Sequence, residues 1–196
     1  MKSKIWLNRQ KRDFFIKKAN LKGYLSRSAF KLIEINQKYK IINHSKRIFE
    51  FGAAPGGWTQ VSLEINPQVE ITAIDLLELK FDHPNITFLK ENYLNFNFNK
   101  LYKKFDLVLS DIAPNTIGHQ STDHLRISTQ VIDLINLLEL ILLKDGSFVT
   151  KIWKGSEEIK IINILKKMFE KVSYFKPKSS RKDSSEIYIV AQKYLN

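Results

Sequence analysis

Residues 49–58 read Phe49-Glu50-Phe51-Gly52-Ala53-Ala54-Pro55-Gly56-Gly57-Trp58, an apolar run that ends abruptly in a glycine-rich turn. Glycine adopts positive φ at little cost, and without a Cβ it lets backbone N–H groups come close to a ligand. In proteins that alternate strands and helices, nucleotides bind at such a turn after a strand. The stretch therefore predicts an α/β protein with a ligand site at this turn.

The spacing of the glycines excludes two common nucleotide-binding motifs. Gly52-x-x-x-Gly56-Gly57 does not match G-x-G-x-x-G. Pro55 also lacks the backbone N–H that would donate to a pyrophosphate. No Lys-Ser or Lys-Thr pair follows, so the loop is not a P-loop either. Taken alone, the loop leaves open a tight turn that binds no ligand.

The position of Asp75 supports the hypothesis that the loop binds a ligand. This residue closes the next apolar run, Val69–Ile74, and lies 23 residues after Gly52. An acidic side chain at such a strand end can accept hydrogen bonds from both hydroxyls of a ribose. The pair of features indicates a cofactor that contains a ribose.

The rest of the chain alternates short apolar runs with helical patterns. The expected strands lie near 46–51, 69–74, 86–89, 106–110 and 146–152, and the expected helices near 26–40, 57–65, 121–143 and 156–169. This order predicts a Rossmann-like, mostly parallel sheet with helices on both faces. Two β-rich runs at 171–176 and 185–192 have no helix between them and predict a C-terminal antiparallel hairpin. We expect one domain over 1–196, with a basic arm and helix in 1–40 and the core in 41–196.

Composition narrows the class of protein. With 196 residues and 43% hydrophobic residues, the chain can build one core, and the lack of cysteine excludes disulfides, thiolate metal sites and cysteine nucleophiles. The four histidines show no ligand spacing, so no metal is expected. No apolar run reaches the roughly 20 residues of a membrane span, and no secretory signal is apparent. We expect a cytoplasmic monomer without a membrane partner.

Positive charge is concentrated at the N-terminus. Residues 1–31 hold ten Lys and Arg residues against Asp13 alone, which gives +9 of the total formal charge of +12. A second basic cluster lies between Lys166 and Lys182. A region that carries most of the charge predicts binding to the phosphates of a nucleic acid, and a solvated tail is the alternative.

Two residues stand out as candidates for chemistry. Asp111 follows the fourth expected strand, at the edge of the sheet where α/β proteins bind ligands, although an aspartate there can also cap a turn. Lys151 lies in the fifth expected strand among apolar neighbours, and a buried lysine is paired or functional. Taken alone, Lys31 is better explained as a solvated helix residue near Glu34, and Glu186 as a strand-edge carboxylate that faces a lysine or arginine.

Five segments in order resemble the FtsJ/RrmJ (RlmE) family of ribosomal RNA 2′-O-methyltransferases over nearly the whole chain. They are Ser26–Leu32, Gly52–Trp58, Ser110–Asn115, Lys151–Gly155 and Ser180–Arg181 through Glu186–Tyr188. Five ordered matches are far more specific than one. The resemblance implies the methyltransferase fold with S-adenosylmethionine as cofactor.

The resemblance also assigns roles to residues. The family's Lys–Asp–Lys–Glu catalytic tetrad falls on Lys31, Asp111, Lys151 and Glu186, which replaces the solvated interpretation of Lys31 and Glu186. The cofactor-binding residues it implies are Glu50, Gly52, Gly56, Trp58, Asp75, Asn92 and Asp111. The family usually has aspartate at the positions of Glu50 and Asn92; an asparagine still offers a carbonyl acceptor for an adenine amine.

The implied reaction is methylation of a ribose 2′-hydroxyl, and the family's bacterial members modify a uridine of large-subunit ribosomal RNA. The expected partner is therefore rRNA or the large ribosomal subunit, with DNA excluded because it lacks the 2′-hydroxyl. Lys151 is the expected proton acceptor, or else a cation that orients the hydroxyl. A transfer RNA 2′-O-methyltransferase, a non-catalytic RNA-binding module and a nucleotide-binding oxidoreductase are the alternatives.

Overall fold

The computed structural model describes residues 13–102, 104–113, 120–155, 157–181 and 184–196. Its centre is a seven-stranded sheet in the order β3-β2-β1-β4-β5-β7-β6. The strands are β1 (Arg47–Phe51), β2 (Glu70–Asp75), β3 (Ile86–Lys90), β4 (Phe105–Ser110), β5 (Leu142–Trp153), β6 (Phe169–Phe175) and β7 (Glu186–Tyr194). The helices are α2 (Phe14–Leu21), α3 (Ala29–Tyr39), α4 (Gly57–Ile65), α5 (Gln120–Ile141), α6 (Glu158–Met168) and the short 3₁₀ helix η1 (Phe98–Leu101).

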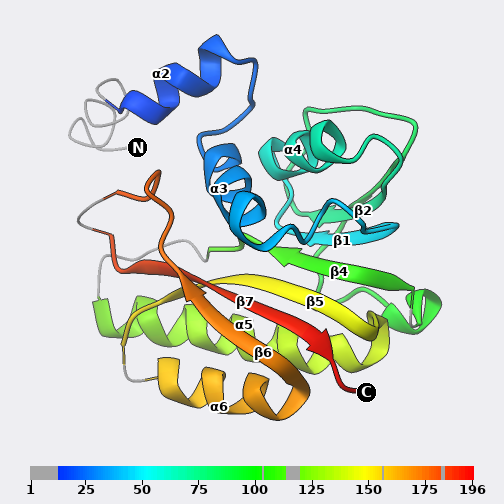
Figure 1. The fold of residues 1–196 in the computed structure, drawn as a ribbon, viewed down its shortest axis with the longest axis vertical. Helices are drawn as coiled ribbons and strands as arrows, with labels where there is room; N and C mark the ends of the chain where they lie inside the picture. Colours follow the sequence, from blue (N-terminus) through cyan, green and yellow to red (C-terminus); the bar gives the residue numbers. More distant parts are fainter. Residues whose placement is uncertain (1–12, 103, 114–119, 156, 182–183) are drawn as a thin grey trace.

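The molecule has three layers (Figure 1). Helices α3 and α4 cover one face of the sheet, and α5 and α6 cover the other. Successive strand residues serve opposite faces: Phe49 belongs to the α5 and α6 core, whereas Ile48 belongs to the α3 and α4 core. Because both faces are covered, the central strands are apolar throughout, which explains the continuous hydrophobic runs in the sequence.

The predicted mostly parallel sheet with a C-terminal antiparallel hairpin is confirmed. Strands β1 to β5 pair in parallel, while β7 pairs antiparallel with both β5 and β6. The second strand of the hairpin therefore inserts between β5 and β6, and β6 forms the edge. As a result, the beginning of β7 lies at the same edge of the sheet as the ends of β4 and β5.

Two local features differ from the sequence-based expectation. Helix α2 lies within the segment that we expected to be a basic arm; Asp13 caps its N-terminus by accepting from the Phe15 N–H at 3.0 Å. Phe15 packs against Phe30 of α3 with 5.5 Å between ring centroids, which fixes this short helix. Strand β5 begins at Leu142, where we expected α5 to continue to residue 143. The first part of the basic arm, residues 1–12, lies outside the described residues.

Helix α5 is the longest helix, with 22 residues, and it contributes its buried side to the core. No helix of the described ranges combines the length and the apolar character that a membrane crossing requires.

Candidate active site

The register of the sheet brings the glycine-rich loop, Asp111 and Lys151 to one edge. Phe51 at the end of β1 pairs with Ser110 of β4, and Ser110 pairs with Thr150 of β5. The next residues along the three strands are Gly52, Asp111 and Lys151. This is the edge formed by the carboxyl ends of the parallel strands, where open α/β sheets bind ligands.

Lys151 and Asp111 form a buried ion pair. The Lys151 Nζ lies 2.9 Å from Oδ1 of Asp111 and donates to its backbone carbonyl at 2.7 Å. The Tyr188 hydroxyl donates to the same Oδ1 at 2.7 Å. Lys151 is only 7% exposed and is paired with Asp111, as a buried lysine among apolar strand neighbours requires unless it is functional. The side chain of Asp111 is thereby held by two donors, from β5 and β7.

A second ion pair joins Lys31 to Glu186. Lys31 Nζ on α3 lies 2.8 Å from Oε2 of Glu186, although the two residues are 155 positions apart in the chain. Ser180 donates from Oγ to the other carboxylate oxygen, Oε1, at 2.7 Å. Lys31 is 8% exposed, so it is not the solvated helix residue that its own sequence context favours. Its ammonium also lies 5.6 Å from the ring centroid of Tyr188, and the hydroxyl of Tyr188 contacts Asp111. Tyr188 therefore connects the two ion pairs.

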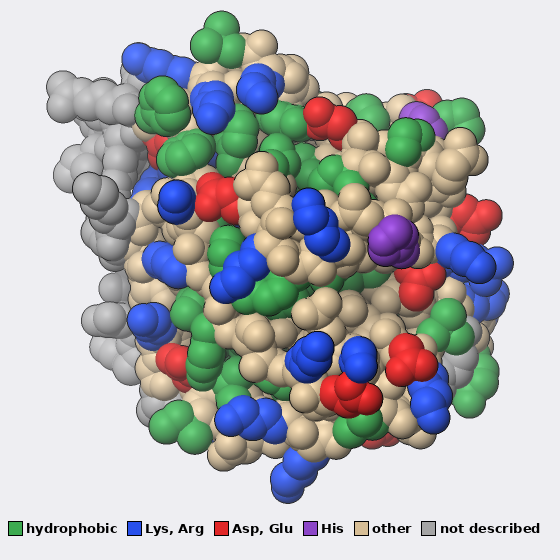
Figure 2. Space-filling model, in the orientation of Figure 1, with side chains coloured by type: hydrophobic (Ala, Val, Ile, Leu, Met, Phe, Trp, Pro, Cys, Tyr) green, Lys and Arg blue, Asp and Glu red, His purple; other side chains and the backbone are tan. Residues whose placement is uncertain are grey.

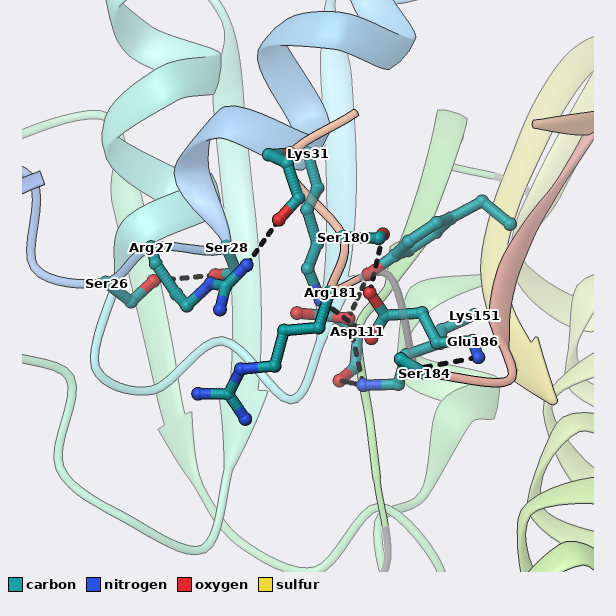
Figure 3. A network of polar contacts seen from close by, with 12 residues as sticks. Ser26, Arg27, Ser28, Lys31, Asp111, Lys151, Ser180, Arg181, Ser184 and Glu186 are labelled. Atoms are coloured by element: carbon teal, nitrogen blue, oxygen red, sulfur yellow. Dashed lines mark hydrogen bonds and ion pairs between the residues drawn. The ribbon is translucent and has the colours of Figure 1, made fainter. Parts of the chain in front are cut away.

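The loop between β6 and β7 is fastened to α3 (Figure 3). The Glu34 carboxylate accepts from the backbone N–H groups of Lys178 and Ser179, and Arg27 donates to the Ser179 carbonyl. Lys31 and Glu34 are three residues apart on α3 and so lie on the same side of the helix, while Arg27 lies in the turn just before it. These side chains cover the loop that carries Ser180.

Burial and charge act in opposite directions on the two carboxyl groups. Burial raises the pKa of Asp111, but the Lys151 and Lys31 ammonium groups more than offset it, so the pKa lies below the ordinary value. The pKa of Glu186 is lowered in the same way, with burial opposed by Lys31. Burial, followed by the nearby Asp111 carboxylate, raises the pKa of Tyr188 well above its usual value. Both carboxyl groups are therefore ionised at neutral pH, and Tyr188 is a neutral donor.

A cavity of about 660 Å³ opens beside this cluster. Its polar lining includes Gly52, Asp75, Asn92 and Asp111. The apolar lining comes from Ile74, Leu76, Leu77, Leu94 and Ile112. A cavity of several hundred cubic ångströms with an apolar wall and a few polar groups is typical of sites for cofactors.

The glycine-rich loop packs too closely for side chains at two positions. A Cβ on Gly52 would lie 2.6 Å from Cγ1 of Ile112, and one on Gly57 would lie 2.2 Å from Oγ of Ser26. Gly52 also has a φ of 71°, which is left-handed. The Asp75 carboxylate ties this loop to the end of β2, because it accepts from the N–H groups of Ala54 at 2.9 Å and Leu77 at 2.8 Å.

Three of the expected cofactor residues do not line the large cavity. Trp58 and Glu50 line a neighbouring cavity of about 70 Å³, which also reaches Gly52 and Asp111. Gly56 lines neither of these two cavities. The Trp58 indole N–H donates to the Ser28 carbonyl at 2.9 Å, so the one polar atom of this side chain is already used within the protein. Any contact of Trp58 with a cofactor would therefore run through its backbone or ring.

Glu50 is almost fully enclosed, with 2% of its surface exposed. The Thr59 hydroxyl donates to its Oε2 at 2.8 Å. Burial, with smaller contributions from Asp111 and Asp75, raises the pKa of Glu50 to about 8. The carboxyl group is thus protonated at neutral pH, unlike the carboxyl groups of the two ion pairs.

Asn92 sits on the cavity wall with its side-chain carbonyl turned toward the main chain. Its Oδ1 accepts from the Leu94 N–H at 3.1 Å, an arrangement that shapes the turn after β3. Its contact with adenine stays a prediction.

Sequence reasoning missed the supporting residues of the cluster. Tyr188 and Ser180 stood in matched segments but received no role, and Glu34 was expected only as a solvated neighbour of Lys31. Their contacts span 77 residues for Tyr188 and Asp111 and 144 for Lys178 and Glu34. The hydroxyl groups of Ser180 and Tyr188, which lie near Glu186 in the sequence, were a signal for these two residues. No comparable signal in the sequence pointed to Glu34. Pro114 and Asn115, which complete the segment after Asp111, lie outside the described residues.

No group of three or more potential metal ligands occurs in the part of the chain that the structure covers. The site brings together two lysine–carboxylate pairs, a tyrosine hydroxyl and an adjoining cavity. The ammonium groups and carboxylates can hold and move a proton, and the cavity can hold a ribose-bearing molecule.

Comparisons with known proteins agree with this arrangement. Residues 24–194 match the model of a family described as FtsJ-like methyltransferase. A ribosomal RNA large subunit methyltransferase E of Zymomonas mobilis is 40% identical over 194 residues, which cover 96% of this chain and 87% of the relative. The protein of the same name from Anaplasma phagocytophilum is 41% identical over 96% of this chain and 80% of the relative.

Solved structures show the same fold. A ribosomal RNA methyltransferase structure from Plasmodium falciparum matches with a TM-score of 0.77 and 31% identity, and covers 88% of this chain and all of that one. A fibrillarin pre-rRNA processing protein of Methanococcus jannaschii matches with a TM-score of 0.57 and 17% identity, which is evidence for the fold alone.

Proposed function

Since the chain belongs to the FtsJ-like methyltransferase family, we propose that it transfers a methyl group from S-adenosylmethionine to the 2′-hydroxyl of a ribose in RNA. The observation that carries this proposal is the meeting of Lys31, Asp111, Lys151 and Glu186 beside a cavity of about 660 Å³. The substrate that we propose is a uridine of large-subunit ribosomal RNA. The names of the relatives support the large-subunit rRNA, and the uridine is part of the proposal.

The residues of the cavity fit S-adenosylmethionine. Gly52 leaves space that a Cβ would fill, so the backbone can approach a ligand. The Asp75 oxygens each accept one backbone N–H, and a carboxylate oxygen has a further lone pair for a ribose hydroxyl. Leu76, Leu77 and Ile112 offer apolar surface to an adenine. When bound, this cofactor supplies a methyl group that is already activated by its sulfonium.

The chain itself must align the 2′-hydroxyl and manage its proton. Alignment of two reactants can account for roughly 7–11 kcal/mol of a barrier, and general-base assistance for roughly 10²–10⁴ in rate. We propose Lys151 as the group that accepts the proton. Its ammonium must first release a proton to solvent, and the resulting amine then takes the proton of the 2′-hydroxyl while Asp111 holds Nζ in place through two contacts. Lys31 and Glu186 would bind and orient the ribose, since their charges face the same cluster.

The proposed substrate sets further properties. DNA lacks the 2′-hydroxyl and would not be a substrate. All four tetrad residues come from one chain, which supports a monomer as the active form. A substrate in ribosomal subunits implies action in the cytoplasm.

The test is methyl transfer from labelled S-adenosylmethionine to large ribosomal subunits that lack the modification, beside naked rRNA and transfer RNA. We expect label in rRNA with the wild type and none with Lys151→Ala. Label in transfer RNA alone would move the substrate to that class. Binding of S-adenosylmethionine without transfer to any RNA would overturn the proposed reaction.

A further inference from the structure

The basic residues closest to the tetrad are already engaged within the protein. Arg27 and Arg181 both bind the Asp13 carboxylate. Lys176 donates to the backbone carbonyls of Ser184 and Glu186. These side chains were expected to be free for RNA phosphates, and they instead fasten the β6–β7 loop.

Helix α2 presents a different surface. Phe14 is 66% exposed and Leu21 is 88% exposed, and the two lie on one side of the helix because they are seven residues apart. Lys17 and Lys22 are exposed beside them. Within the described part of the chain, neither lysine forms an ion pair. Figure 2 shows hydrophobic and basic side chains side by side over α2.

The inner side of α2 attaches it to the rest of the protein, while Phe14 on the outer side contacts the Phe15 ring, with 5.4 Å between centroids, and the Lys18 ammonium at 5.9 Å. Ala19 is buried, Phe15 packs on Phe30, and the Lys18 ammonium lies 5.0 Å from the ring centroid of Phe30. Phe14 and Leu21 together place two large apolar side chains on the exposed side of a helix that is fixed from its other side. Such surfaces mark interaction sites.

A short chain of contacts connects α2 to the tetrad residue Glu186. Asp13 immediately precedes α2 and binds Arg181, whose neighbour Ser180 donates to Glu186. Figure 1 shows α2 above the β6–β7 loop, on the side of the sheet that holds α3. RNA that reaches the tetrad can therefore extend onto α2.

We propose that the exposed side of α2, formed by Phe14, Lys17, Leu21 and Lys22, binds a single-stranded segment of the RNA substrate, with one base stacked on Phe14. The inference rests on the proposed function. Helix α2 contains no acidic residue, which suits a polyanion. Lysine is depleted at protein–protein interfaces, whereas aromatic rings between basic residues are the usual platform for single-stranded RNA.

The first test is Phe14→Ala. Stacking on an aromatic side chain contributes about 1–3 kcal/mol per base, so we expect the Kd for a short single-stranded RNA oligonucleotide to rise about 5- to 150-fold. The KM for unmodified large subunits should rise with it, while kcat at saturating RNA stays at the wild-type value. Phe14→Trp should retain binding, and its indole fluorescence should be quenched by the oligonucleotide beyond the quenching seen with the wild type.

Tyr102→Ala is the matched control, because Tyr102 is a similarly exposed aromatic residue, at 61%, that precedes β4 and so lies at the opposite edge of the sheet. It should leave Kd and KM unchanged. Leu21→Glu provides a second variant that places a negative charge on the surface and should weaken binding without a fall in Tm. Replacing Lys17 and Lys22 together by alanine should reduce the slope of log K against log salt by about 1.4, or about 0.7 per phosphate.

The outcomes separate this inference from the proposed function. If the wild type methylates rRNA and Phe14→Ala leaves Kd and KM unchanged, the α2 inference is wrong and the function stands. If Phe14→Ala changes the sedimentation coefficient of the protein and leaves its affinity for RNA unchanged, the surface is a contact between copies of the chain and the inference is overturned. If the wild type methylates no RNA, the proposed function itself fails.

Discussion

Lys151 contacts Asp111 twice, through the carboxylate oxygen at 2.9 Å and the backbone carbonyl at 2.7 Å. A lysine held by both the side chain and the main chain of one residue has little freedom to rotate. Because Asp111 follows β4 directly and Lys151 lies in the neighbouring β5, the sheet itself fixes the position of the ammonium group. The arrangement suits a group that must meet a reacting oxygen in a single geometry.

Lys151→Arg separates the two possible roles of this lysine. Arginine keeps the positive charge and can still bind Asp111, but it does not lose its proton in proteins. If Lys151 accepts the proton, Lys151→Arg should reduce kcat by roughly 10²–10⁴. The measurement is single-turnover methyl transfer as a function of pH. Wild-type activity in Lys151→Arg, with a flat profile, would assign Lys151 to orientation alone.

Ser180→Ala tests how Glu186 is positioned. Its hydroxyl donates to Oε1 of Glu186 at 2.7 Å, and a hydrogen bond to a charged group contributes about 1.5–3 kcal/mol. We expect kcat to fall at least about 10-fold, because about 1.5 kcal/mol corresponds to roughly a factor of 10 in rate. The affinity for S-adenosylmethionine should stay unchanged. Ser180→Thr should restore most of the activity because it restores the hydroxyl.

The matched control for Ser180 is Ser62→Ala. Ser62 is also buried, but its hydroxyl has no hydrogen-bond partner among the described residues. Its replacement should leave kcat unchanged. Equal losses in Ser180→Ala and Ser62→Ala would mean that the effect comes from general destabilisation and not from Glu186.

The sequence predicted the sheet more fully than it predicted the site. Alternating apolar runs and helical patterns are local signals, and helix α4 begins and ends where the pattern indicated. The pairing of Lys31 with Glu186 depends on the path of the whole chain, and lysine and glutamate are ordinarily solvated; only the family resemblance brought these two together. Helix α2 was missed because its stability comes from Asp13 and from packing on Phe30, not from a strong helical period.

Gly52→Ala should disturb both stability and cofactor binding. Gly52 and Gly23 have similar left-handed φ values, 71° and 75°, but a Cβ on Gly23 meets nothing within 4 Å, whereas one on Gly52 meets Ile112. Gly23→Ala should therefore cost only the backbone strain of about 1–2 kcal/mol. Gly52→Ala adds overpacking of about 1–3 kcal/mol and displaces a residue of the cavity wall.

Denaturant unfolding and calorimetric titration with S-adenosylmethionine measure the two effects. Gly23→Ala should bind the cofactor as the wild type does, and Gly52→Ala should bind it more weakly. Equal destabilisation and unchanged binding in both variants would show that the loop can relax around a methyl group.

Glu50 predicts an unusual dependence of stability on pH. Its pKa in the folded protein is about 8 because of burial, whereas the ordinary pKa of a glutamate is 4.5. As pH rises above 4.5, the unfolded chain loses this proton and the folded chain keeps it, so the free energy of unfolding falls until pH reaches about 8. The slope approaches about 1.4 kcal/mol per pH unit within this window. Glu50→Gln removes the titration, so it should gain stability relative to the wild type as pH rises.

The measurement is urea unfolding of the wild type and Glu50→Gln at several pH values between 5 and 8. Glu70→Gln serves as the control, because Glu70 is an exposed residue of the neighbouring strand β2 and pairs with the exposed Arg47. Its difference from the wild type should stay constant over this range. A constant difference for Glu50→Gln as well would mean that Glu50 is ionised in the folded protein. Strand β1 would then contain a buried negative charge next to the glycine-rich loop.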